Sequence, residues 1–170
     1  MDPLTSDEIS ELTGLLRKMF TFRRQLVKEH PLASKIKAVQ VPPALSESIA
    51  VLLIRQAKVL PELAGSQVQL DRRRADIIVT RDSRELRIEV KATGNKGFQR
   101  FRKKDIAADY LLWIHFDSYF ESDGDEEILV YVITKPGKYF RNNQEVFVQS
   151  LSDNLGHQPA PISFRLSELT

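Results

Sequence analysis

Three residues, Asp76, Glu89 and Lys91, have the types and the spacing of a hydrolytic site. Carboxylate oxygens are the ligands that Mg²⁺ prefers in proteins. A lysine ammonium beside them can orient an attacking water, stabilise its hydroxide form or hold a phosphate oxygen. A metal, a nucleophile and a phosphate clamp are together sufficient to hydrolyse a phosphodiester, provided that the fold brings the three side chains to one face.

A predicted β-hairpin brings these side chains together. The segments on either side of Asp82-Ser83 alternate apolar and polar residues, as strands with one buried face do. With those two residues as the loop, paired residue numbers sum to 165, so Asp76 lies opposite Glu89 with Cβ atoms about 4.5–5.5 Å apart. Lys91 projects from the same face as Glu89. A divalent cation would relieve the repulsion between the facing carboxylates.

Asp76, twelve intervening residues and the run Glu89-Val90-Lys91 resemble the PD-(D/E)xK signature of the restriction-endonuclease-like nucleases. The resemblance covers residues 44–116 and implies an α/β (α+β) fold with a central mixed β-sheet flanked by helices. It also implies that Asp76 and Glu89 bind metal, that Lys91 is the catalytic lysine, and that the Val90 main-chain carbonyl is a further metal ligand.

Two other positions bear on this resemblance. Ala75 stands where the name-giving proline of the family often lies, a departure at a position that the family keeps loosely. Glu47 lies in the first turn of a predicted helix on which many family members carry a metal-associated glutamate. An acidic residue there also complements the helix dipole, so both interpretations of Glu47 stand.

We predict one domain with the element order α-α-β-β-β-α-β-β. A Thr5–Glu8 capping box opens the first helix, which ends near His30 because Pro31 follows, and Pro43 suits the first turn of the second helix. The second helix continues to Leu60. The predicted strands lie over 68–70, 74–80, 86–93, 110–116 and 128–133, with late strands over 146–148 and 162–165. The remaining predicted elements are a short helix over 32–39, a loop over 94–100 and a helix over 101–109. Residues 1–41 form an N-terminal helical region, 44–116 the catalytic core and 117–170 the C-terminal strands and loops.

Positive charge is concentrated in one segment. Residues 72–104 carry 12 basic and 4 acidic side chains, whereas the net charge of the whole chain is only +2. This concentration favours nucleic acid as the partner. The residues expected to contact DNA are Arg72, Arg73, Arg74, Lys96, Gln99, Arg100, Arg102, Lys103 and Lys104, of which Gln99 and Arg100 have donors that can read base edges. The alternative is a solvated surface with Phe98 and Phe101 packed in the core.

The composition excludes several functional classes. With 170 residues, 42% hydrophobic and 28% charged, the chain has ordinary globular proportions. The absence of cysteine excludes disulfide scaffolds, thiolate zinc sites and cysteine nucleophiles. Without a membrane-length apolar run, a secretion signal or a glycine-rich phosphate loop, we expect a cytoplasmic protein that uses neither membrane nor nucleotide cofactor. We expect His115, inside an apolar strand, to be a satisfied core histidine.

These observations predict a Mg²⁺-dependent DNA endonuclease, most like a small type II restriction endonuclease, in which Mn²⁺ can substitute. Cutting both strands of a duplex with one active site per chain usually needs a symmetric homodimer. The alternatives are a structure-selective nuclease similar to a Holliday-junction resolvase and a non-catalytic DNA-binding module. For the three central residues, the alternative is a solvated hairpin face with a salt bridge.

Overall fold

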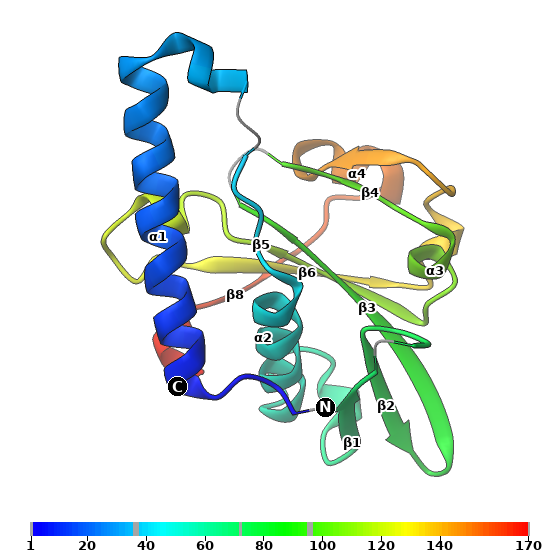
Figure 1. Ribbon diagram of the computed structural model, residues 1–170. Helices are drawn as coiled ribbons and strands as arrows, with labels where there is room; N and C mark the ends of the chain where they lie inside the picture. The colour runs from blue at the N-terminus through cyan, green and yellow to red at the C-terminus, as the bar shows by residue number, and fades with distance from the viewer. Residues whose placement is uncertain (1, 36–37, 72, 95–96, 170) are drawn as a thin grey trace.

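A six-stranded mixed β-sheet forms the centre of the molecule, as Figure 1 shows for the computed structural model, which describes residues 2–35, 38–71, 73–94 and 97–169. The strand order is β1-β2-β3-β5-β6-β8, and β4 and β7 form a separate two-stranded sheet. The strands are β1 (Gln67–Leu70), β2 (Ile77–Arg81), β3 (Arg84–Thr93), β4 (Phe98–Arg100), β5 (Tyr110–His115), β6 (Ile128–Thr134), β7 (Glu145–Phe147) and β8 (Ile162–Phe164). The α-helices are α1 (Ser6–Glu29), α2 (Pro43–Arg55), α3 (Lys103–Ile106) and α4 (Leu151–Leu155).

Both N-terminal helices begin where the sequence predicts. The Glu8 N–H donates to Thr5 Oγ1 (3.3 Å) and the Thr5 N–H donates to Glu8 Oε2 (2.8 Å), which completes the capping box of α1. Helix α2 begins at Pro43 but ends at Arg55 rather than Leu60, because the chain turns through left-handed backbone at Ala57 and Leu60. The predicted helix over 32–39 is a 3₁₀ helix over Pro31–Lys35, and residues 36–37 lie outside the described part.

The predicted hairpin register is confirmed. Ile77 pairs with Ile88 and Arg81 with Arg84, so paired numbers sum to 165. Asp82-Ser83 forms the two-residue turn, with φ of 48° and 62°. Positive φ at both central residues is what a type I′ turn requires, and this turn matches the twist of the two strands.

Strand β2 begins later than residue 74, where the alternation predicts its start. The Asp71 carboxylate accepts hydrogen bonds from the N–H groups of Arg73 (2.8 Å) and Arg74 (3.4 Å). An aspartate that binds the backbone two residues ahead stabilises a turn in place of extended strand. Asp76 is therefore the last residue before β2.

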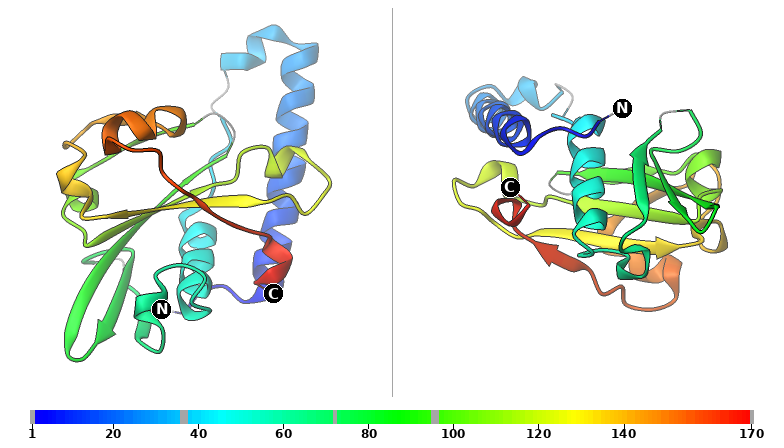
Figure 2. Two further views of the ribbon diagram at one scale, coloured as in Figure 1. Left: turned by 180° about the vertical axis from the view of Figure 1, so that it is seen from behind. Right: turned by 90° about the horizontal axis from the view of Figure 1, so that it is seen from below.

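The two faces of the sheet pack against different elements. Ile88 belongs to the core under α1 and α2, whereas Trp113 belongs to a second core with residues of β7 and α4. In Figure 2 the view from behind shows α4 on the far side of the sheet from α1 and α2. Glu89 and Lys91 are in register with Leu111 and Trp113, so both project from this second face. Strand β5 is covered on both faces, as predicted, because Leu112 and Ile114 pack in the first core and Leu111 and Trp113 in the second.

The crossover from β3 to β5 differs most from the prediction. Strand β4 lies within the segment predicted to be a loop and pairs antiparallel with β7. The helix predicted over 101–109 is reduced to α3, since Phe101 before it is fully buried and the chain enters β5 at Tyr110. In the described part of the chain, no helix is both long and apolar enough to cross a membrane.

Candidate active site at the start of β2

The carboxylates of Asp76 and Glu89 converge on one cation. The Lys104 ammonium lies 2.9 Å from Asp76 Oδ1 and 2.7 Å from Glu89 Oε2. Asp76 comes from the residue before β2, Glu89 from the middle of β3, and Lys104 from α3, the short helix on that face of the sheet. The sequence therefore predicts the pairing of the two carboxylates correctly, but it assigns Lys104 to DNA contact alone.

Main-chain hydrogen bonds fix Asp76 in this position. Strand β3 continues past the first residue of β2, and the Val90 N–H donates to Asp76 Oδ2 (2.9 Å). On the other side, the Asp71 N–H donates to the Asp76 carbonyl (3.1 Å). One carboxylate oxygen of Asp76 thus substitutes for a missing strand partner, and the other oxygen is directed to the cation.

Burial separates Glu89 from the charged residues nearer the hairpin tip. Glu89 is 1% exposed, whereas Glu85 and Arg87 on the same face of β3 are exposed. Burial raises the pKa of Glu89 to about 7, and the nearby Asp76 charge acts in the same direction, against the hydrogen bond from Lys104. A solvated hairpin face does not describe this carboxylate, and strongly perturbed buried acids cluster at functional sites.

Lys104 remains charged in this arrangement. Partial burial acts against its charge, but hydrogen bonds to Glu89 and Asp76 outweigh that effect and raise the pKa of the ammonium. Half of the Lys104 side chain is exposed, so its cation closes the site from the solvent side.

Lys91 lies on the predicted face, and its ammonium is bound to a different acid. Lys91 Nζ lies 2.8 Å from Asp105 Oδ1, and Asp105 is fully buried. Asp105 Oδ2 also accepts the Arg102 N–H (2.7 Å), which caps the single turn of α3. Sequence reasoning missed Asp105, because no local pattern links residues separated by fourteen positions that meet only after the crossover.

The donor set fits a hard divalent cation with open positions. Within residues 2–35, 38–71, 73–94 and 97–169, no three His, Cys, Asp or Glu side chains gather as a metal site. Glu47 is buried in α2 beyond its first turn, contrary to the expected position at the helix dipole, and it does not complete such a group with Asp76 and Glu89. Mg²⁺ is commonly held by one or two carboxylates, with water and phosphate completing its shell, and two converging carboxylates that already hold a cation meet that need.

Two of the arginines expected at DNA have acidic partners. Arg74 contacts Asp71 (2.9 Å) and Glu85 (2.6 Å), and Arg100 pairs with Glu145 across β4 and β7. These guanidinium groups would have to exchange partners in order to bind phosphate.

Gln99 and its aromatic neighbours are divided between the surface and the core. The Gln99 amide donates to the Ala92 carbonyl (2.6 Å), which ties β4 to the end of β3. Phe101 is buried, as expected for at least one of the pair, whereas Phe98 is 47% exposed and packs against Phe147 on β7. The amide of Gln99 therefore supports the fold in this structure.

Three of the cations expected to contact DNA have no ion pair with other described residues. They are Arg73, Arg102 and Lys103, all exposed. Arg72 and Lys96 lie outside the described residues. Arg102 and Lys103 directly precede Lys104 in the chain, so exposed positive charge adjoins the residue that contacts the carboxylates.

His115 is a satisfied core histidine, as predicted. Its Nδ1 lies 2.9 Å from Thr93 Oγ1, which also accepts the Trp113 indole N–H (3.0 Å). Burial lowers the pKa of His115, against the opposing effect of Asp117.

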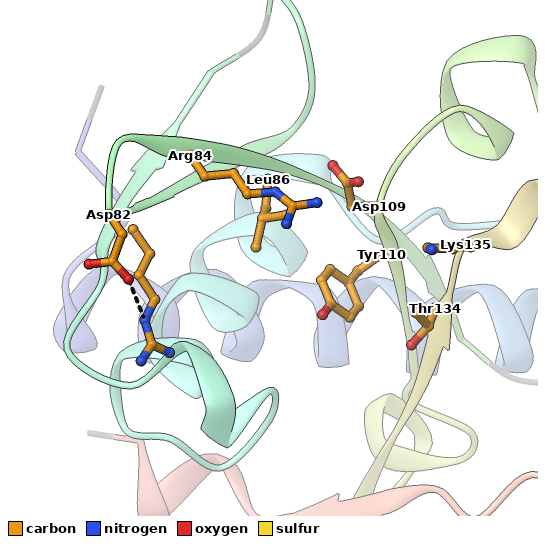
Figure 3. A pocket seen from close by; sticks show the side chains of 8 residues that line it. Asp82, Arg84, Leu86, Asp109, Tyr110, Thr134 and Lys135 are labelled. Atoms are coloured by element: carbon orange, nitrogen blue, oxygen red, sulfur yellow. Dashed lines mark ion pairs between the residues drawn. The ribbon is translucent and has the colours of Figure 1, made fainter.

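A pocket of about 410 Å³ lies on the opposite face of the sheet, beside the hairpin. Figure 3 shows Arg84, Leu86 and Tyr110 extending to this side from β3 and β5. Arg84 and Leu86 alternate along β3 with Glu85, Arg87 and Glu89, so the pocket is separate from the carboxylate site.

No protein-family model, curated protein or solved structure matches this chain.

Proposed function

We propose that this protein is a Mg²⁺-dependent DNA endonuclease, of the type II restriction kind, that hydrolyses phosphodiester bonds in duplex DNA. The observation that carries the proposal is the convergence of Asp76 and Glu89 on one cation, with Lys91 on the same face of β3. A buried carboxylate beside a second, partly buried one opposes folding unless a cation neutralises their charge.

The order of the elements supports the same proposal. Helix α2 precedes three antiparallel strands, β1, β2 and β3, and α3 then leads to β5, which runs parallel to β3. A helix, three strands, a helix and a strand form the core that the PD-(D/E)xK resemblance implies.

Each residue has a distinct role in the proposed reaction. Asp76 and Glu89 would hold the metal, with the Val90 carbonyl as a further ligand. When bound, the metal supplies a Lewis acid that offsets the negative charge developing on the phosphate. Lys91 would orient the attacking water or hold a phosphate oxygen from the same face. Arg73, Arg102 and Lys103 would bind neighbouring phosphates and position the duplex.

Cleavage assays with matched carboxylate variants test the proposal. Glu89→Gln should abolish Mg²⁺-dependent cleavage of linear duplex DNA, because it removes a metal ligand while keeping the shape of the side chain. Glu85→Gln is the control, since Glu85 lies on the same face of the same strand but is exposed and pairs with Arg74. Wild-type cleavage by Glu89→Gln would refute the site.

The substrate distinguishes the alternatives. Discrete fragments from mixed-sequence linear duplex indicate a restriction endonuclease, and cleavage confined to a four-way junction indicates a resolvase-like nuclease. Binding without cleavage in either Mg²⁺ or Mn²⁺ indicates a DNA-binding module.

We further propose that a second copy of this chain completes the enzyme through α1. Leu15, Met19 and Phe22 form one stripe of this helix and are 51%, 54% and 64% exposed. The acidic residues of α1 lie mostly in its first half and the basic ones in its second half, so antiparallel pairing of two α1 helices would oppose unlike charges. Phe22→Glu should dissociate the dimer in sedimentation velocity, whereas Lys28→Glu, an exposed position on the opposite side of α1, should not.

A further inference from the structure

Lys104 occupies the place where a metal ligated by Asp76 and Glu89 would have to bind. Its ammonium contacts one oxygen of each carboxylate, at 2.9 and 2.7 Å. The remaining Asp76 oxygen is engaged by the Val90 N–H (2.9 Å). A divalent cation bound to both acids would repel the ammonium at such short range, so the two cations exclude each other.

Lys104 can leave without unfolding its helix. Its side chain is 51% exposed, whereas the Glu89 side chain that it contacts is 1% exposed. The next residue, Asp105, is anchored separately by Lys91 (2.8 Å) and by the Arg102 N–H (2.7 Å). Rotation of one long side chain about its own torsions is therefore enough to open the site, while α3 stays attached to β3.

Lys91 is not equivalent to Lys104 in this respect. Its side chain is 16% exposed, and its partner Asp105 is fully buried. Release of Lys91 would leave a buried carboxylate without its cation, which is far more costly than exposing a lysine that is already half in solvent.

We propose that Lys104 is an exchangeable counter-ion that keeps Asp76 and Glu89 together in the metal-free protein and is displaced when a divalent cation binds. The inference rests on the proposed metal site and adds that Lys104 competes with the metal for the two carboxylates. It predicts that the metal affinity of the wild type is limited by Lys104, and that metal binding exposes the Lys104 ammonium.

Metal titration without DNA tests the competition. Mn²⁺ binding is followed by the electron paramagnetic resonance signal of the free ion, with Mg²⁺ as competitor. Lys104→Gln should bind Mn²⁺ about tenfold more tightly than the wild type, given the usual strength of hydrogen bonds between charged groups. Lys58→Gln is the control, because Lys58 also neutralises a carboxylate, that of Glu168 (2.7 Å), elsewhere in the chain, and it should leave the affinity unchanged. Equal or weaker binding by Lys104→Gln would overturn the inference.

Lysine acylation of the wild-type protein, read by mass spectrometry, tests displacement without any variant. Lys104 should be acylated more slowly than Lys103 in the metal-free protein, and saturating Mg²⁺ should accelerate its acylation several-fold while leaving Lys103 unchanged. Acylation of Lys104 that does not respond to a metal shown to bind would contradict displacement.

The two proposals fail differently. If Glu89→Gln loses Mn²⁺ binding while Lys104→Gln binds like the wild type, the metal site stands and the role of Lys104 is refuted. If neither the wild type nor Lys104→Gln binds Mn²⁺, both proposals are refuted. Tight binding by Lys104→Gln alone supports both, since Lys104 then blocks the site completely.

Discussion

Two neighbouring residues, Lys104 and Asp105, supply opposite charges to the two halves of the candidate site. Lys104 bridges Asp76 and Glu89, and Asp105 holds Lys91. A shift of α3 would therefore change all three ion pairs together. The site consists of a Lys104 bridge and a Lys91–Asp105 pair, linked by a single helical turn.

The buried pair of Lys91 and Asp105 should show strong coupling. Asp105→Asn leaves the Lys91 ammonium beside a neutral amide and should lower the free energy of unfolding by about 3 kcal/mol. Lys91→Met should cost a similar amount, because it leaves the Asp105 carboxylate buried without its cation. In the double variant neither charge is stranded, so urea unfolding should give a loss well below the sum of the two. Simple additivity would show that the pair is not coupled.

The stability of the folded protein should depend on pH through His115, and the lowered pKa of this residue sets the sign. Its pKa is lowered in the folded protein by burial, so the folded state resists protonation more than the unfolded state, whose histidine pKa is about 6.5. The contribution of neutral His115 to the free energy of unfolding is complete above a pH of about 6.5. It is lost as the pH falls through the lowered pKa of the folded protein. The raised pKa of Glu89 acts in the opposite direction, so the comparison must be with His115→Asn. Urea unfolding measures the difference in free energy of unfolding between the wild type and His115→Asn. This difference should decrease as the pH falls from 7.5 to 5.5. A difference that stays constant over this range would exclude the effect.

At the scale of elements, the hairpin was predictable because its signals are local. Two adjacent residues, Asp82 and Ser83, fix the loop, and the alternation on either side fixes the faces. The early end of α2 and the existence of β4 were not predictable in this way. Strand β4 forms because Phe98 pairs with Phe147, and nothing near Phe98 in the sequence signals a partner so far along the chain.

The same difference between local and long-range signals applies to the candidate site. Asp76 and Glu89 meet through the hairpin, so the sequence predicts their contact. Lys104 and Asp105 reach the site only because α3 folds back over the second face, and their partners lie 28 and 14 positions earlier in the chain. Tertiary packing of the crossover, rather than any motif, decides which lysine contacts the carboxylates.

Relief of strain at the hairpin turn is an independent test of the register. Ser83 has a φ of 62°, a conformation that costs L-residues roughly 1 kcal/mol and glycine nothing. Ser83→Gly should raise the free energy of unfolding by about that amount in urea titration, whereas Ser83→Val should lower it. Neither change should alter Mn²⁺ affinity, because the turn lies at the opposite end of the hairpin from Asp76. Stabilisation by valine would mean that the turn has a different geometry.

At the scale of the whole molecule, charge is distributed unevenly. The segment over residues 72–104 has a surplus of basic side chains, whereas residues 105–170 carry 11 acidic and 4 basic ones. Under the proposed function, the structure narrows the expected DNA contacts: Arg74, Arg100 and Lys104 are already paired with acids, and the expected contacts that are exposed and have no described ion pair are Arg73, Arg102 and Lys103. Steering of a duplex toward the carboxylates is therefore expected to depend on the beginning of α3.

Salt dependence of DNA binding tests that expectation. Cations that neutralise phosphates release counter-ions, so the logarithm of the affinity falls linearly with the logarithm of salt concentration. Replacing Arg102 and Lys103 together by alanine should weaken binding about equally on all sequences and reduce the slope by up to roughly two. Lys58→Ala is the control, since Lys58 pairs with Glu168 at 2.7 Å and should leave the slope unchanged. Fluorescence anisotropy at several salt concentrations, on duplexes of different sequence, measures both quantities. An unchanged slope in the double variant would show that these residues form a solvated surface and that DNA approaches the site from elsewhere.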